Sequence, residues 1–209
     1  MVAEPANAAD RLLSLVRRLG VLRTRDLAGQ NVPRTALARL VADGVLDRPS
    51  RGVYVLADAD VTEHHAIAQA CKRVPHGVVC LLSALRFHRL TTQAPHEVWI
   101  GIDRKARKPT LDYPPLRVVR FAGAGLTTGV EEHAIEGVTV RVTNPARTVA
   151  DCFAYRNTVG LDVALEALRE CLRERRATVD DLYRAAQARR MANVMRPYLE
   201  ALAGAKTAR

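Results

Sequence analysis

The stretch GVLRTRDLAGQNVPRTALARLVADGVLDRPSRGVYVL, residues 20–56, decides the fold of this chain. Its capping and turn-forming residues divide it into two short helices followed by two short strands. An apolar-periodic segment before it adds another helix. The expected elements are helices at 10–19 and 25–28, a helix from Pro33 to its stop at Gly44, and strands at 45–48 and 53–56. Small domains with this order place one helix in the major groove of DNA, so it predicts a winged helix-turn-helix domain over residues 1–57.

The helix that begins at Pro33 carries the residues expected to contact DNA. Its leucines recur at helical spacing and predict a buried stripe, so Thr35 and Arg39 point outward, with Arg34 in the exposed first turn. Arginine suits this place because its planar fork pairs with guanine or phosphate in a bidentate manner. The two strands at 45–48 and 53–56, with residues 49–52 between them, form the predicted wing. The predicted DNA contacts, from this helix, the start of the helix before it and the wing, are Arg23, Arg25, Arg34, Thr35, Arg39, Arg48, Ser50 and Arg51.

The overall charge agrees with a polyanionic partner. The 209 residues carry a formal charge of +10, and the 48% hydrophobic content is that of a globular protein. If about five phosphates are neutralised, log K should fall against log salt with a slope of roughly −4 to −5. Residues 1–20 lack the apolar core of a secretory signal, and the longest apolar run, Val78 to Leu82, is too short to span a bilayer. We therefore expect a cytoplasmic protein without membrane association.

The remainder of the chain, residues 58–209, is predicted to contain both helices and strands, and we call it the body. An amphipathic helix is expected after a cap at Thr62, and another near 83–90. Strands are predicted at 98–102 and 118–121, followed by a hairpin of strands 130–135 and 138–143, and residues 144–209 are mainly helical. The predicted fold class is thus α+β, with an N-terminal winged helix-turn-helix, a mixed α/β body and a helical C-terminal region.

A basic loop follows the first body strand and has two open interpretations. Arg104, Lys105, Arg107 and Lys108 form either a solvated loop or a second contact with a polyanion. Neither the histidines nor the four cysteines show metal-ligand spacing, and the cysteines fit buried core positions. No phosphate loop or nucleophile motif is present. We therefore expect no metal, no cofactor and no catalytic residue.

The string VTNPARTVAD, residues 142–151, is the most distinctive part of the body. It predicts the end of a strand, an Asn144 cap, Pro145 at the first helical position, and then a helix. Arg147 and Asp151 lie one helical turn apart, in the weaker order for an ion pair, so we expect a contribution of only a few tenths of a kcal/mol. These features favour a structural hub.

Three strings together resemble the AbiEi family of antitoxins from type IV toxin–antitoxin, or abortive infection, systems. They are RGVYVL at 51–56, LLSALRFHRLTTQAPHEVWIGI at 81–102 and VTNPARTVADCFAYRNTVGLDVALEALRE at 142–170. The resemblance implies an N-terminal winged helix that binds inverted repeats in its own promoter and represses the operon. It also implies that residues 58–209 form an antitoxin domain that counteracts a co-encoded nucleotidyltransferase-like toxin. The operator contacts that it implies are Arg34, Thr35, Arg39, Arg48 and Arg51.

Two other functions stay open on the sequence. The chain could be an ordinary repressor whose body binds a small ligand or forms a dimer, without a toxin partner. It could also be a nucleic-acid enzyme targeted by its N-terminal domain, for which Glu97, Asp103 and Lys105 offer a weak match to a magnesium-dependent nuclease.

Overall fold

The computed structural model describes residues 8–19, 22–27, 33–57, 64–111 and 113–207. Contacts between Cα atoms divide the chain into two compact units. The first unit contains residues 1–75, 110–115 and 134–140, and the second contains residues 76–109, 116–133 and 141–209. Helices and sheets occur in both units, so the chain is an α+β protein, as predicted.

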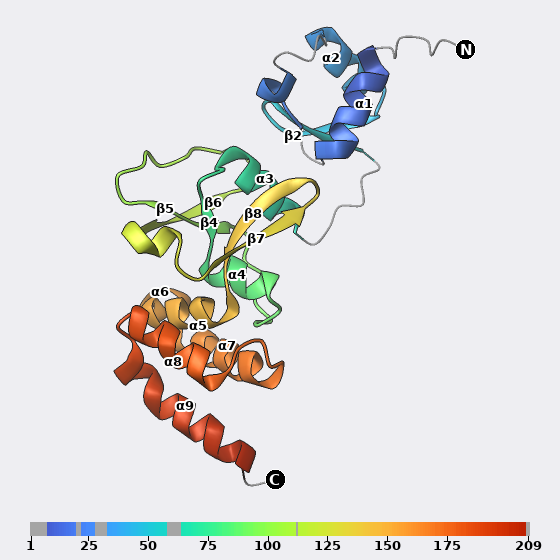
Figure 1. Ribbon diagram of the computed structural model, residues 1–209. Helices are drawn as coiled ribbons and strands as arrows, with labels where there is room; N and C mark the ends of the chain where they lie inside the picture. The colour runs from blue at the N-terminus through green and yellow to red at the C-terminus, as the bar shows by residue number, and fades with distance from the viewer. Residues whose placement is uncertain (1–7, 20–21, 28–32, 58–63, 112, 208–209) are drawn as a thin grey trace, which may run out of the picture. The chain divides into compact units, whose positions relative to one another are not determined.

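The first unit begins with a small three-stranded antiparallel sheet and the helices around it, which we call the N-terminal module (Figure 1). Its strands lie in the order β1-β3-β2. Leu12, Leu22, Leu37 and Leu46 are fully or almost fully buried in its apolar core. The module consists of α1 (Ala8–Leu19), β1 (Leu22–Arg23), the 3-10 helix η1 (Thr24–Leu27), α2 (Arg34–Ala42), β2 (Leu46–Ser50) and β3 (Val53–Leu56).

Local backbone chemistry explains the ends of α2. Pro33 is extended and caps the helix, so α2 begins at Arg34, one residue later than predicted. The predicted stop at Gly44 is confirmed: its φ is +69°, a left-handed conformation that glycine adopts without steric cost. The backbone N–H of Val45 then donates to the Leu40 carbonyl, one of the carbonyls that the last turn of a helix leaves without a partner inside the helix.

Two elements of the module differ from the prediction. The helix expected at 25–28 is a single 3-10 turn, and the wing strand β2 runs on to Ser50, so that only Arg51 and Gly52 form the turn. The short strand β1 was not predicted. It pairs with β3 over two residues, too few for a period-two pattern to appear in the sequence.

The same unit continues with α3 (His65–Arg73), the helix expected after Thr62, a residue outside those described. Lys72 Nζ lies 3.2 Å from Asp26 Oδ2, and Arg73 Nη2 donates to the Arg51 carbonyl at 2.5 Å. These polar contacts join the last turn of α3 to the N-terminal module.

The second unit is organised around a mixed five-stranded sheet in the order β6-β5-β4-β8-β7. The central strand β4 pairs antiparallel to β5 and parallel to β8, while β5 and β6 pair in parallel. The hairpin predicted at 130–143 is confirmed, and its tip, residues 134–140, belongs to the first unit. The strands are β4 (Val78–Val79), β5 (Val98–Asp103), β6 (Leu116–Phe121), β7 (Val130–Ile135) and β8 (Val138–Thr143).

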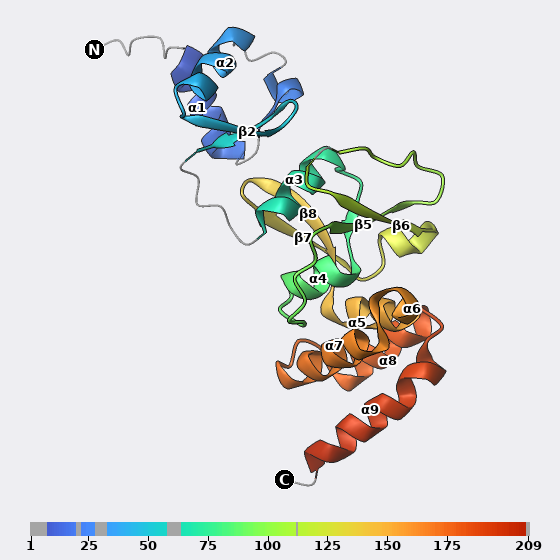
Figure 2. The same ribbon diagram turned by 180° about the vertical axis from the view of Figure 1, so that it is seen from behind.

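Helices gather at one end of this sheet, and α5 is the element they share, since it packs against α4, α7 and α8 (Figure 2). Phe153 of α5 is fully buried in an apolar cluster to which α5, α7 and α8 contribute. The predicted start of α5 is confirmed: Asn144 caps it and Pro145 is its first residue. The helices of the second unit are α4 (Leu81–Phe87), the 3-10 helix η2 (Gly123–Leu126), α5 (Pro145–Ala154), α6 (Arg156–Val159), α7 (Leu161–Arg173), α8 (Val179–Ala188) and α9 (Ala192–Thr207).

Helix α8 illustrates how a local signal fixes a boundary. Thr178 and Asp181 form a capping box, in which each side chain accepts from the backbone N–H of the other residue. Across the part of the chain that the structure describes, no helix combines the length and the apolar character that crossing a bilayer requires.

Candidate nucleic-acid interface

The N-terminal module exposes most of the side chains predicted to contact DNA. Arg39 of α2 is the clearest case, because 85% of its side chain is accessible and its Nε lies 3.8 Å from Asp43 Oδ2, a weak surface ion pair. Its guanidinium is therefore available to a partner. The exposed members of the predicted set are Arg25, Thr35, Arg39, Arg48 and Arg51, whereas the side chains of Arg34 and Ser50 lie outside the structural description.

Arg23 differs from these residues because it faces the interior of the module. Its side chain is only 14% exposed, with Nη2 3.5 Å from Asp26 Oδ1, and burial lowers the pKa of its guanidinium. Burial alone would raise the pKa of Asp26, but the Arg23 backbone N–H and the Lys72 ammonium outweigh it and lower that pKa. The Arg23 side chain therefore serves to hold η1 in place, and its geometry does not present it to a duplex.

The turn of the wing is fixed from two sides. Gly52 has φ +73°, and its carbonyl accepts from the Thr24 backbone N–H at 3.0 Å. A Cβ on Gly52 would lie 3.0 Å from Thr24 Oγ1, so both the conformation and the close approach favour glycine here. The neighbouring Arg51 carbonyl accepts from Arg73. The backbone that carries the exposed Arg51 side chain is thus held by two other elements.

The basic loop after β5 lies in the second unit and is also tied down. Arg104, Lys105, Arg107 and Lys108 are all exposed. Arg120 Nη1 donates to the carbonyl of Asp103 at 2.9 Å and to that of Ala106, while Asp103 Oδ1 accepts from the Lys105 backbone N–H at 2.8 Å. Asp103 thus shapes the loop. Among the described residues, no three His, Cys, Asp or Glu side chains are grouped in a way that could hold a metal ion.

Comparison with known families decides what the N-terminal module is. A family model described as "Transcriptional regulator, AbiEi antitoxin" matches residues 10–57, which include α2, β2 and β3. Residues 10–57 are similar to the AbiEi antitoxin regulators. We therefore call residues 10–57 the AbiEi module, and the resemblance noted in the sequence is confirmed over this part.

A solved structure extends the comparison beyond the AbiEi module. The crystal structure of the RV2827C protein from Mycobacterium tuberculosis matches with a TM-score of 0.60 at 15% identity, over 86% of this chain and 71% of that chain. At this identity the likeness concerns the fold alone. No curated protein sequence matches the chain.

Outside the AbiEi module, the distinctive motif at 142–151 forms a buried ionic hub. Asp151 is inaccessible to solvent and lies between two guanidiniums, with Arg147 Nε 3.3 Å from its Oδ2 and Arg189 Nε in contact with its Oδ1. Arg147 also donates to the backbone carbonyls of Gly125 and Thr128. Burial raises the pKa of Asp151, and the two guanidiniums oppose this rise by favouring the carboxylate. The sequence showed Arg147 and Asp151 but not Arg189, 38 positions beyond Asp151.

The rest of the motif joins β8 to α5. Thr148 Oγ1 lies 2.7 Å from Thr143 Oγ1 and donates to the Asn144 carbonyl at 2.8 Å, and Asn144 Oδ1 caps the Arg147 backbone N–H. Gly129 approaches this corner so closely that a Cβ would lie 3.1 Å from Arg147 Cδ, and its φ is +63°. The motif is therefore a structural corner, as its residues favoured.

His88 completes the corner with a pH-sensitive contact. Its Nε2 donates to the Thr143 carbonyl at 2.7 Å, and burial lowers the pKa of the imidazole. As the pH falls, His88 is protonated in the unfolded chain at a higher pH than in the folded chain. Its contribution to the free energy of unfolding is therefore fully present well above about pH 6.5, and it is lost as the pH falls below that value.

We expect the free energy of unfolding, measured by urea titration at about pH 7.5 and 5.5, to fall on acidification and to fall less in His88→Gln. The exposed His96→Gln should behave like the native chain, and an equal acid loss in all three proteins would contradict this role.

The four cysteines are buried, as predicted. Burial raises the pKa of Cys171 to about 11, and it raises those of Cys80 and Cys152 as well. Thiolates are the reactive form, so a catalytic role is unfavourable for these three side chains.

Proposed function

We propose that this chain is a DNA-binding antitoxin that represses its own toxin–antitoxin operon. The observation that carries the proposal is the match of residues 10–57 to AbiEi transcriptional regulators, on a module whose α2 and wing expose arginines. Residues 1–57 are the winged helix-turn-helix domain in this proposal, and they bind inverted repeats of the promoter. Residues 58–209 form the antitoxin domain, which counteracts a co-encoded nucleotidyltransferase-like toxin.

The geometry of the AbiEi module supports separate roles for its two basic elements. Helix α2 buries Leu37 and Leu40 and presents Arg39 on its opposite side, as a helix that reads base edges must do. Arg48 and Arg51 extend from the wing, where contacts with phosphate position the protein on a duplex. Arg39 is therefore the proposed base-reading residue, and the wing arginines hold the backbone.

Substitution of Arg39 and Arg51 tests this division of roles. We expect Arg39→Ala to cost about 1–3 kcal/mol of operator binding and to relax specificity at one base position, because a bidentate contact is lost. Arg51→Ala should weaken binding to all sequences alike. The measurement is fluorescence anisotropy on the footprinted promoter site and on a panel of single-base variants of it.

Arg196→Ala is the matched control, since it removes an exposed arginine from α9 in the second unit. It should change neither affinity nor specificity. Equal, sequence-independent losses for Arg39→Ala and Arg51→Ala would contradict the assignment of α2 as the recognition helix.

The antitoxin half of the proposal needs a separate test. We expect the chain, co-expressed with the toxin gene of its operon, to restore growth, and Arg39→Ala to retain this rescue because it affects only the DNA contact. A neighbouring gene without nucleotidyltransferase character, together with failure to rescue growth, would leave a repressor without a toxin partner.

A further inference from the structure

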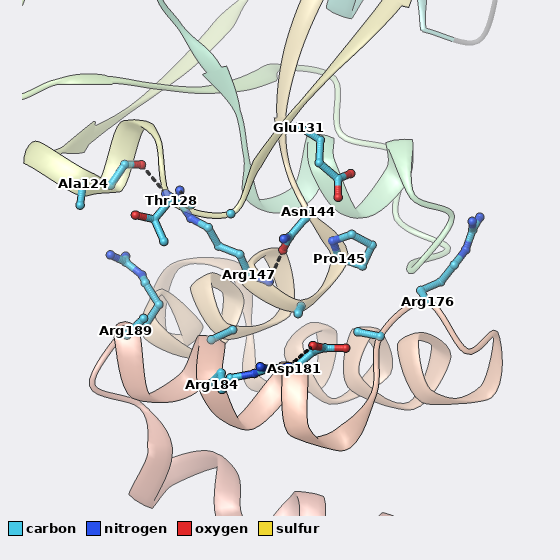
Figure 3. A pocket seen from close by; sticks show the side chains of 16 residues that line it. Ala124, Thr128, Glu131, Asn144, Pro145, Arg147, Arg176, Asp181, Arg184 and Arg189 are labelled. Carbon is cyan, nitrogen blue, oxygen red and sulfur yellow. Dashed lines mark hydrogen bonds and ion pairs between the residues drawn. The ribbon is translucent and has the colours of Figure 1, made fainter.

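A cavity of about 560 Å³ lies within the second unit, over the first turn of α5 and along one face of α8 (Figure 3). Small side chains leave this space open, among them Ala146 of α5 and Ala185 and Ala188 of α8. The size falls in the range of small-molecule sites, which is about 300–1,000 Å³. The cavity plays no part in the DNA contacts proposed above.

Arginines dominate the charged part of the lining, which includes Arg147, Arg176, Arg184 and Arg189. Arg147 and Arg189 share the single carboxylate of Asp151, so this trio keeps a net positive charge beside the cavity. Arg189 is 26% exposed, and Figure 3 shows its side chain directed toward the edge formed by Ala124 and Thr128. Arg184, by contrast, is paired with Asp180 and Asp181.

The start of α5 adds to the positive potential. Asn144, Pro145, Ala146 and Arg147 all line the cavity, so the N-terminal end of this ten-residue helix faces it. Pro145 has no N–H and Asn144 Oδ1 accepts that of Arg147, so the helix contributes mainly the positive end of its macrodipole, which favours an anion. Together with Arg189, this end of the helix gives one edge of the cavity a positive potential.

Glu131 gives another edge of the cavity the opposite character. Figure 3 shows its carboxylate over Asn144 and Pro145, away from Arg189. A carboxylate accepts hydrogen bonds from hydroxyl or amino groups and repels a second anion. The lining therefore calls for a ligand with an anionic end and a hydrogen-bond-donating end.

We propose that this cavity binds a nucleotide, with its phosphates between Arg189 and the start of α5 and its sugar hydroxyls toward Glu131. The cavity volume, the arginines and the separate acidic edge are all accounted for by this class of ligand. The inference goes beyond DNA binding and does not depend on it.

Calorimetric titration of the full chain with ATP tests the site. We expect Arg189→Gln to weaken ATP binding at least about tenfold, since charge-assisted contacts with phosphate are lost. Ala188→Trp, a substitution at an exposed lining position, should abolish binding by filling the space. The matched control Arg196→Gln removes the same charge outside the lining and should stay within about twofold of the native value. Thermal unfolding without ligand verifies that each variant is folded.

Titrations with parts of the ATP molecule, and of a variant in the AbiEi module, complete the test. Pyrophosphate and adenosine should each bind more weakly than ATP, because each meets only one edge of the cavity. Arg39→Ala should bind ATP like the native chain, because its change lies in the AbiEi module. Retained binding in Ala188→Trp, or loss in Arg39→Ala instead of Arg189→Gln, would overturn the proposal, as would pyrophosphate binding as tightly as ATP.

Discussion

Asp151→Asn should lower the free energy of unfolding by about 3–5 kcal/mol, the range for breaking a buried ion pair on one side. Asp151 is inaccessible to solvent, and its carboxylate is shared by Arg147 and Arg189, so the few tenths of a kcal/mol expected from the sequence, a value for exposed pairs, is wrong for this buried pair. Without that charge, two guanidiniums repel each other in a poorly solvated corner. The loss should appear in urea titrations as a lower midpoint with an unchanged m-value.

Asp180→Asn is the control for this experiment. Asp180 is 76% exposed and contacts Arg184, so its removal should change stability by no more than about 0.5 kcal/mol. Arg189→Gln should cost less than Asp151→Asn, because Asp151 keeps Arg147. Equal small losses in all three variants would show that the buried hub contributes no more than a surface pair.

Raising the salt concentration from about 50 to 200 mM should weaken operator binding by about 250- to 1,000-fold. This follows from the slope of about −4 to −5 expected for roughly five neutralised phosphates. In the double variant Arg48→Gln/Arg51→Gln the slope should become shallower by about 2, because two phosphate contacts are lost. Anisotropy titrations over a salt series measure the slope directly.

The salt slope of a second double variant, Arg104→Gln/Arg107→Gln, tests whether the basic loop of the second unit also contacts the duplex. A native slope in this variant would assign the loop to solvent, and a reduced slope would assign it to a polyanion contact. A native slope in the wing variant would contradict the proposed DNA-binding surface.

Elements with strong local signals could be predicted from the sequence. Asn144 and Pro145 fix the start of α5, and Thr178 with Asp181 fixes the start of α8, because each cap uses residues at most four positions apart. Glu136 and Gly137, both at positive φ, form the two-residue turn between β7 and β8, which is likewise a local feature. Such contacts do not depend on the rest of the fold.

Elements formed by distant partners could not be predicted. Strand β4 has only two residues, Val78 and Val79, and exists because β5 and β8 lie on either side of it. Glu166 accepts hydrogen bonds from Thr91 and Thr92, which the sequence places more than seventy positions away. The candidate site shows the same limit, since helical spacing predicts outward residues such as Arg39, whereas the inward turn of Arg23 depends on Asp26 and the core.

The buried cysteines make the chain its own reporter of opening. A thiol-specific reagent reacts with an accessible thiolate, and burial keeps the four cysteine side chains out of its reach in the folded chain. Labelling therefore measures transient exposure and not surface chemistry. Cys71 belongs to the first unit, and Cys80, Cys152 and Cys171 belong to the second, so the order in which the sulfur atoms react separates the opening of one unit from that of the other.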